Sequence, residues 1–181
     1  MSELVLRAES AADREAVRAV VAASFGADEV PALLDDLRTS SVWLDLSFVA
    51  ELEGEVVAHV ALTRAWVDAP AGAAEVLFLG PLSVRPDRAH AGIGTALVSQ
   101  AIEALAGRDE PLVFVVGDPG YYSRFGFVQG DLLGFRPPSA RVPAPTFQAR
   151  PLPGRPGFVT GALVLPDVWW RHDLVAGPAD A

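Results

Sequence analysis

A proline inside a long apolar strand places the strongest constraint on how this chain can fold. Residues 75–84 form a run of apolar side chains long enough for a central strand, and Gly80-Pro81 interrupts it. Because proline has no N–H to donate to a neighbouring strand, a regular ladder of hydrogen bonds cannot continue through this position. The sequence therefore predicts a strand that is bulged or splayed from a neighbour at Gly80-Pro81.

The rest of the chain alternates between strand-like and helix-like patterns, which indicates an α/β fold with one mixed sheet and flanking helices. Ser10 is a plausible N-cap for the first helix, and Gly107 closes the helix before residue 112. The expected strands are residues 3–7, 48–52, 56–66, 75–84, 112–116, 146–152 and 158–165. Helices are expected after Ser10, after Pro31, over 92–106 and, for one or two turns, over 121–125, with a loop at 68–73.

Length and composition fit one compact domain over residues 1–181, with a frayed tail at 177–181. The chain has 181 residues, no cysteine and a formal net charge of −9. The acidic balance disfavours nucleic acid and anionic membranes as partners, and the absence of cysteine fits a reducing compartment. No apolar run approaches the ~20 residues that cross a bilayer, so a cytoplasmic protein is expected.

A glycine-containing loop between a strand and a helix is the first motif with chemical meaning. Gly92 and Gly94 precede a helical stretch, and the first N–H groups of a helix have no acceptor within it. Such groups can bind a phosphate or pyrophosphate. Glycines also serve tight turns for steric reasons alone, so this motif by itself is weak. There is no Gly-Lys-Ser/Thr, which excludes a P-loop, and Leu97 stands where a dinucleotide fingerprint has its third glycine.

A second motif follows the next predicted strand: Gly-Asp-Pro-Gly-Tyr-Tyr-Ser-Arg-Phe-Gly-Phe at 117–127. With Leu-Gly-Pro-Leu-Ser-Val at 79–84 and Val-Pro-Ala-Pro-Thr-Phe-Gln at 142–148, the chain resembles the GNAT superfamily of N-acetyltransferases. The strong matches cover residues 79–127. Two motifs in the right order and at the right separation are much more specific than either alone.

The resemblance implies a single GNAT-like domain whose central strands splay apart to hold acetyl-CoA as co-substrate. An amine from a small molecule or a protein would attack the thioester directly. Tyr122 matches the tyrosine that protonates the departing thiolate, and a backbone N–H near Leu82 would polarise the carbonyl. A homodimer is possible in such families. The residues implied in cofactor binding are Leu82, Ser83, Val84, Ala89, His90, Ala91, Gly92, Ile93, Gly94 and Thr95.

The sequence departs from the family pattern at the start of the loop, where Ala89 and His90 replace a Gln or Arg and a frequent glycine. Glu75 and Asp118 are candidates for the general base, with water as a third possibility. His59 is expected to be a hydrogen-bonded structural residue or to face the acceptor cleft. The histidines are too dispersed to predict a metal site. A non-catalytic module of the same fold that binds acyl-CoA is the alternative function, and an interaction protein with no cofactor is a weaker one.

Overall fold

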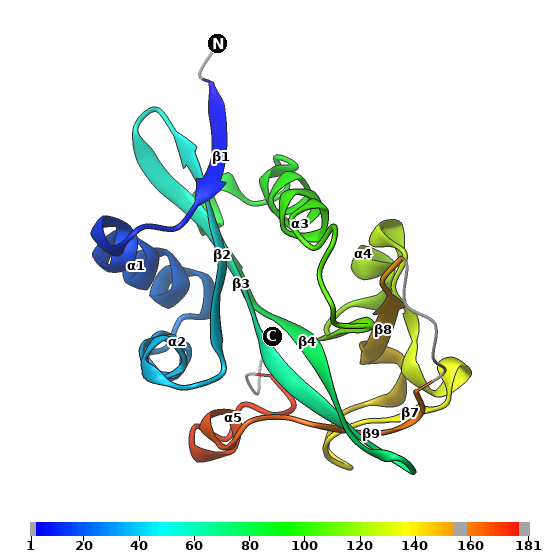
Figure 1. Ribbon diagram of the computed structural model, residues 1–181. Helices are drawn as coiled ribbons and strands as arrows, with labels where there is room; N and C mark the ends of the chain where they lie inside the picture. Colours follow the sequence, from blue (N-terminus) through cyan, green and yellow to red (C-terminus); the bar gives the residue numbers. More distant parts are fainter. Residues whose placement is uncertain (1–2, 154–158, 178–181) are drawn as a thin grey trace. The chain divides into compact units, whose positions relative to one another are not determined.

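The computed structural model describes residues 3–153 and 159–177, and these fall into two compact units (Figure 1). Unit 1 comprises Met1–Leu62 and Gly80–Leu105, and unit 2 comprises Thr63–Leu79 and Ala106–Ala181. Strands β3 (Glu55–Ala69) and β4 (Gly72–Val84) pass through both units. The chain therefore enters each unit twice, and neither unit is a continuous segment.

Unit 1 is built on antiparallel strands with helices on both faces. Strand β1 (Leu4–Ala8) pairs with β2 (Trp43–Leu52) in the register Leu4↔Leu52 to Ala8↔Phe48. Figure 1 shows α1 (Arg14–Phe25) and α2 (Glu29–Thr39) on one face of these strands and α3 (Ile93–Glu103) on the other. Short 3-10 turns lead into α1 (Ala11–Asp13) and lie before α3 (Pro86–Arg88).

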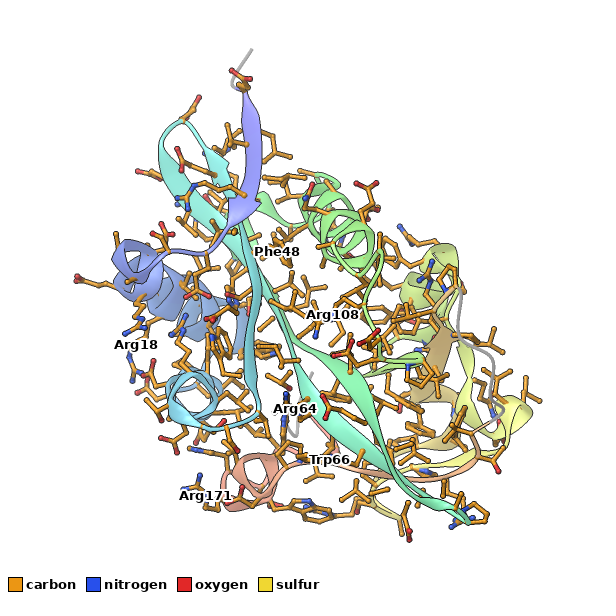
Figure 2. The ribbon with its side chains drawn as sticks, in the orientation of Figure 1. Arg18, Phe48, Arg64, Trp66, Arg108 and Arg171 are labelled. Carbon is orange, nitrogen blue, oxygen red and sulfur yellow. The ribbon has the colours of Figure 1, made fainter. Side chains whose placement is uncertain are left out.

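The helices of unit 1 form where apolar side chains recur every three or four residues. The buried ones are Val17, Val20 and Val21 of α1, Leu33, Leu34 and Leu37 of α2, and Leu97, Val98 and Ala101 of α3. Helix α2 begins at Glu29, earlier than predicted, because Pro31 lies in the first turn, where its missing N–H breaks no helical hydrogen bond. Arg18 of α1, on the outer side of the helix in Figure 2, pairs with Asp35 of α2.

Tight turns connect the long strands. Glu53 and Gly54 have positive φ values of 56° and 81°, as a two-residue hairpin turn requires, and they join β2 to β3. The next hairpin is shorter than the predicted loop at 68–73, because β3 continues to Ala69 and β4 starts at Gly72. Gly72 has φ 121°, a value that side chains with a Cβ rarely adopt.

Unit 2 contains β5 (Leu112–Val116), β6 (Val128–Gln129), β7 (Phe135–Arg136), β8 (Phe147–Pro151), β9 (Gly161–Val164), α4 (Pro119–Tyr122) and α5 (Asp167–Arg171). The 3-10 turns Ser123–Phe125, Gly130–Leu133 and Ala144–Thr146 complete it. Strand β5 pairs in parallel with β4 at Leu77↔Val113 and Phe78↔Phe114, and antiparallel with β8 along its whole length. The splaying of β4 beyond Gly80 stays a prediction.

Aromatic rings fill the core of unit 2. The ring of Phe114 lies 4.9 Å from that of Phe135, edge to face, and 5.6 Å from that of Phe147, stacked. Phe78 meets Trp169 of α5 with ring centroids 5.0 Å apart. The predicted strands at 146–152 and 158–165 are confirmed in shorter form as β8 and β9.

Hydrogen bonding joins the nine strands of the described chain in the order β1-β2-β3-β4-β5-β8-β6, with β9 pairing with β3 and β7. Pairings of both directions occur, since β9 is antiparallel to β3 and parallel to β7. The predicted α/β fold with a mixed sheet is confirmed. No helix in the described ranges is long and apolar enough to span a membrane. The predicted frayed tail lies outside these ranges, apart from Gly177.

Candidate functional site

The connection from β4 to α3 in unit 1 has the geometry of an anion-binding loop. Helix α3 starts at Ile93, directly after Gly92, so the N–H groups of Ile93, Gly94 and Thr95 belong to its first turn. The carbonyl of Gly92 accepts the first helical bond, from the N–H of Ala96 at 3.0 Å. Ala91 and Gly92 are exposed. The loop thus presents main-chain donors at the positive end of a helix dipole.

Two residues of this loop have left-handed backbone conformations. Gly92 has φ 79°, and a Cβ added there would meet no atom within 4 Å. His90 has φ 63°, although it carries a full side chain. The space beside Gly92 lets another molecule approach the main chain closely. The left-handed turn at His90 explains in conformational terms why a glycine would be favoured at that position.

Charged side chains surround the start of the loop. Arg85 binds Asp87 through two nitrogens, at 2.6 and 2.8 Å, and Glu55 at 3.0 Å. These partners raise the pKa of Arg85, chiefly through the bonds to Asp87, and Arg85 in turn lowers the pKa of Asp87. The Nε of Arg88 lies 3.5 Å from a carboxylate oxygen of Asp87. Arg88 is therefore a half-buried cation at the start of the loop with one long ion pair.

The β4 residues predicted to contact the cofactor lie just before this loop. Leu82 and Val84 are half-buried, and Ser83 between them is buried. The Oγ atom of Ser83 has no hydrogen-bond partner in the described part of the chain. Unit 1 thus brings together all ten residues predicted for cofactor binding, in one strand end, one loop and one helical turn.

Tyr122 lies in unit 2, on the short helix α4, which is positioned by the turn before it. The side-chain carboxylate of Asp118 accepts a hydrogen bond from the N–H of Gly120 at 2.8 Å. The main-chain carbonyl of Asp118 accepts hydrogen bonds from the N–H groups of Tyr121 and Tyr122, both at 3.0 Å. A Cβ on Gly117 would lie 2.5 Å from Cε2 of Tyr122, so only glycine leaves room for the ring there. Asp118, a candidate base, is thus the N-cap of this helix.

Burial keeps the Tyr122 hydroxyl protonated. The residue is 8% exposed, and its ring lies 5.7 Å from Phe127 and 5.0 Å from Tyr121, in both cases edge to face. Burial, with a smaller contribution from Tyr121, raises the pKa of Tyr122. A phenol in such surroundings is a hydrogen-bond donor at neutral pH.

Gln148 also supports the turn before Tyr122, and in the sequence alone it stands out only as part of a motif. Its Nε2 donates to the carbonyl of Gly117 at 3.1 Å, and only 1% of the residue is exposed. The N–H of Gly117 donates to the carbonyl of Thr146 at 2.9 Å. Because a buried amide must satisfy its polar atoms, Gln148 fixes the carbonyl end of the turn. The Phe-Gln motif is the sequence signal that points to this role.

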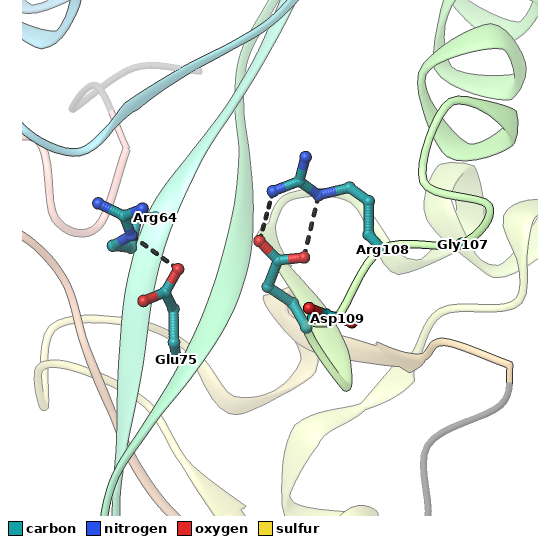
Figure 3. Close-up of a pocket in the computed structure, with 6 residues that line it drawn as sticks. Arg64, Glu75, Gly107, Arg108 and Asp109 are labelled. Atoms are coloured by element: carbon teal, nitrogen blue, oxygen red, sulfur yellow. Dashed lines mark hydrogen bonds and ion pairs between the residues drawn. The ribbon is translucent and has the colours of Figure 1, made fainter.

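Glu75, the other candidate base, lines an open polar cavity within unit 2 (Figure 3). The cavity has a volume of about 570 Å³ and is lined by Arg64, Glu75, Gly107, Arg108, Asp109 and Glu110. The carboxylate of Glu75 accepts from Nε of Arg64 at 2.7 Å, and Glu110 pairs with Arg108. Glu75 is thus held in an ion pair at the wall of this cavity.

His59 belongs to a buried polar cluster within unit 1. It is 0% exposed, and its Nε2 lies 3.0 Å from Oε2 of Glu9. Glu9 also binds Arg38 of α2. Burial acts to raise the pKa of Glu9, but the hydrogen bonds from His59 and Ser47 and the charge of Arg38 together lower it. The expectation of a hydrogen-bonded structural histidine fits this contact. In the described residues, no group of three His, Asp or Glu side chains could hold a metal ion.

Comparisons with known proteins find matches to both the sequence and the fold. The uncharacterized N-acetyltransferase YjhQ of Escherichia coli K12 is 35% identical over 119 residues, which are 64% of this chain and 64% of that protein. The GNAT family N-acetyltransferase YhbS of Escherichia coli, in a crystal structure with CoA, matches with a TM-score of 0.82 and 25% identity over 94% of both chains. A GNAT family acetyltransferase from Brucella melitensis, in complex with acetyl-CoA, matches with a TM-score of 0.73 and 26% identity over 92% of this chain and 98% of the other.

The alignment with YjhQ thus spans less than two thirds of that relative's length. The model of the acetyltransferase (GNAT) family matches residues 3–127. This range covers unit 1 from β1 onward and the turn that carries Tyr122. The strand–loop–helix of residues 82–95 lies within the matched range. The chain belongs to the acetyltransferase (GNAT) family.

Proposed function

We propose that this protein is an acetyl-CoA-dependent N-acetyltransferase that transfers the acetyl group to an amine by direct attack. The observation that carries the proposal is the anion-binding loop of residues 89–95, in a chain that shares its fold over 94% of its length with a GNAT structure in complex with CoA. Both base candidates are already engaged, Asp118 as a helix cap and Glu75 in an ion pair.

The residues of the loop fit the pyrophosphate of CoA. First-turn N–H groups of α3 supply donors, and the open space beside Gly92 admits a phosphate close to the main chain. Arg88 adds a cation whose single ion pair within the described residues, to Asp87, is long. Ala89 and His90 replace side chains that the family often has, but main-chain donors do not depend on side-chain identity. These features support Ala89 to Thr95 as the pyrophosphate site and Leu82 to Val84 as the segment that binds the pantetheine arm.

Acetyl-CoA supplies an activated thioester whose acetyl carbon an amine can attack. In the proposed mechanism the main-chain N–H of Leu82 donates to the carbonyl oxygen, which stabilises negative charge as it develops. Tyr122 donates a proton to the sulfur as the carbon–sulfur bond breaks. Burial raises the pKa of Tyr122, which keeps its proton in place until it is needed, and burial would also raise the pKa of a departing thiolate.

Binding of acetyl-CoA is the first test. Calorimetric titration of the purified protein with acetyl-CoA should give saturable heat, with CoA binding similarly and NAD giving none. CoA release should then be followed with a panel of polyamines, arylalkylamines and lysine peptides. A protein that binds neither acetyl-CoA nor CoA would overturn the assignment of residues 82–95.

Replacing Tyr122 tests the general acid. Tyr122→Phe removes the hydroxyl and keeps the packing against Phe127, so kcat should fall by roughly 100-fold while the Kd for acetyl-CoA stays the same. Tyr121→Phe is the matched control, since it removes the neighbouring hydroxyl and should retain most of kcat. Equal kcat for Tyr122→Phe and the wild type across pH would show that another group protonates the sulfur.

A non-catalytic module that binds acyl-CoA is the second candidate. It is favoured by the engagement of both Glu75 and Asp118, which leaves neither as a free base. Saturable binding of acetyl-CoA with no CoA release for any amine in the panel would support it.

A further inference from the structure

The tyrosine proposed as general acid stands on a turn that is held from a neighbouring strand. Tyr122 belongs to α4, which begins two residues after Gly117, and Gly117 is the first residue after β5. The strand that holds the turn is β8, and β5, α4 and β8 all belong to unit 2. The contacts between Tyr122 and β8 can therefore be followed within one unit.

The ring of Tyr122 packs directly on the main chain of Gly117. A Cβ added to Gly117 would lie 2.5 Å from Cε2, 3.1 Å from Cδ2 and 3.5 Å from Cζ of the tyrosine. Cζ is the ring atom that carries the hydroxyl. Because closely packed atoms leave no free space between them, a displacement of Gly117 displaces the hydroxyl as well.

Both main-chain polar groups of Gly117 are bonded to residues at the start of β8. The N–H of Gly117 donates to the carbonyl of Thr146 at 2.9 Å. The carbonyl of Gly117 accepts a hydrogen bond from Nε2 of Gln148 at 3.1 Å, and the same Nε2 lies 3.5 Å from the carbonyl of Thr146. The side-chain amide of Gln148 therefore bridges the turn and the strand.

The register of the two strands explains why residue 148 reaches the turn. Gln148 lies opposite Val115 in the antiparallel ladder of β5 and β8, and the bond from Gly117 to Thr146 continues this ladder. Facing side chains point to the same side of a sheet, as do side chains two positions apart on one strand. The side chain of Gln148 thus extends on the side of the sheet where the Tyr122 ring covers Gly117.

The turn needs a donor at this position, and glutamine supplies one without charge. The residue is 1% exposed, so it is shielded from solvent. Both nearby acceptors are carbonyl oxygens, which an ionised carboxylate would repel. A side chain without a donor would leave the carbonyl of Gly117 free to turn toward water or another N–H, and the turn would move with it.

We propose that Gln148 is a positioning residue for proton transfer, which acts through Gly117 to hold the Tyr122 hydroxyl where the departing sulfur needs it. This role rests on the proposed acetyl transfer with Tyr122 as general acid. Proton transfer requires the donor within hydrogen-bond reach of its acceptor, so a displaced ring lowers kcat. The affinity for acetyl-CoA should change little, because Gln148 lies outside the segments proposed to bind the cofactor.

Gln148→Met removes the donor and keeps a side chain of similar length. With the amine that gives the fastest CoA release, kcat should fall by roughly tenfold or more, while the Kd for acetyl-CoA changes by less than about twofold. Gln129→Met is the matched control. Gln129 lies opposite Gln148 on β6, and its amide donates to Asp131 at 2.8 Å, so this variant should keep the wild-type kcat. An unchanged kcat in Gln148→Met would refute the proposal.

Gln148→Glu tests the donor itself through the pH profile. An ionised carboxylate has no hydrogen to donate, whereas the protonated acid has one O–H for the carbonyl of Gly117. The kcat of this variant relative to the wild type should therefore rise as the pH falls and the acid form accumulates. The same ratio for Gln148→Met should not depend on pH. A Gln148→Glu enzyme as slow as Gln148→Met at every pH would contradict the role of the donor.

A double variant separates positioning from a general loss of structure. If Gln148 acts through the Tyr122 hydroxyl, its loss matters little once that hydroxyl is gone. Tyr122→Phe combined with Gln148→Met should then be about as slow as Tyr122→Phe alone, because residues that act as a unit are not additive. A structural defect would slow both backgrounds by the same factor, and that result would overturn the proposal.

The ring can also be observed without turnover, because the chain has two tyrosines. Labelled with fluorotyrosine, the protein should give a fluorine NMR signal for each, and Tyr121→Phe assigns them. Gln148→Met should shift or broaden the Tyr122 signal, and Gln129→Met should leave it in place. An unmoved Tyr122 signal in Gln148→Met refutes positioning, whatever the turnover. A wild type that releases no CoA with any amine refutes the acetyl transfer and the catalytic role together, whereas a fully active Gln148→Met refutes positioning alone.

Discussion

His90 adopts a left-handed backbone conformation, φ 63°, in the loop that precedes α3. For a residue with a Cβ, the left-handed region costs about 1–2 kcal/mol in steric energy, whereas glycine adopts it without this cost. Glycine in turn loses more conformational entropy on folding, about 0.5–1 kcal/mol. The balance favours glycine slightly, so His90 is kept at some cost in stability.

His90→Gly should therefore raise the free energy of unfolding by about 0.5–1 kcal/mol, which corresponds to roughly 1–4 °C in Tm. Circular dichroism during heating measures the shift. His90→Ala is the control, because it removes the imidazole and keeps the backbone strain, and it should give no gain. Equal Tm values for the glycine and alanine variants would refute the strain argument.

At this scale the sequence motifs identified the loop and Tyr122 but not the residues that hold them. The loop and the start of α3 were predictable because Gly92, Gly94 and the helix after them are consecutive in the chain. Gln148 and Gly117 are 31 positions apart, and only the pairing of β8 with β5 brings them together. The same is true of His59 and Glu9, which lie 50 positions apart.

Strand β9 shows how close packing can depend on a single missing side chain. Gly161 is the first residue of β9, with φ 150°, and a Cβ there would lie 2.0 Å from the carbonyl oxygen of Asp68 on β3. The next pair in the ladder is Asp68↔Ala162. No larger residue fits without a shift of one strand relative to the other.

Gly161→Ala should loosen the pairing of β9 with β3 and lower the free energy of unfolding by more than about 2 kcal/mol. Urea unfolding followed by fluorescence measures the loss. Gly72→Ala is the matched control, since Gly72 also has a positive φ, 121°, but has no atom within 4 Å of an added Cβ. Similar losses in the two variants would attribute the effect to backbone conformation and not to the contact with Asp68.

The long elements were predictable from periodicity, and the short ones were not. Strands β3 and β4, with 15 and 13 residues, and helix α3, with 11, carry apolar patterns along their whole length. Strands β6 and β7 have two residues each, and their pairing with β8 and β9 is set by packing in unit 2. Helix α5 follows Pro166 and is held by Trp169 against Phe78, a contact that no local pattern reveals.

The molecule as a whole has two compact units that share β3 and β4. Each unit needs two separate segments of chain, and β3 and β4 run without a break from one unit into the other, so unfolding of one unit frees strand ends that continue into the other. We therefore expect residues 1–181 to unfold as one cooperative domain, as the sequence predicts.

Tryptophan fluorescence and circular dichroism should give coincident thermal transitions in the wild type. Of the four tryptophans, Trp43 lies in unit 1, and Trp66, Trp169 and Trp170 lie in unit 2. In Trp43→Phe, fluorescence reports unit 2 alone, and its midpoint should still match that from circular dichroism. Two separate midpoints would show that the units unfold independently.

The division of the chain also sets the order in which a nascent protein can fold on the ribosome. The first part of unit 1 to emerge contains β1, α1, α2, β2 and the start of β3. Unit 1 is complete only when the end of β4 and helix α3 have followed, that is, when residue 105 has been made. Until then β3 exposes an open edge that can pair with other chains. Polypeptides cut short before Leu105 are accordingly the species of this protein that most require a chaperone.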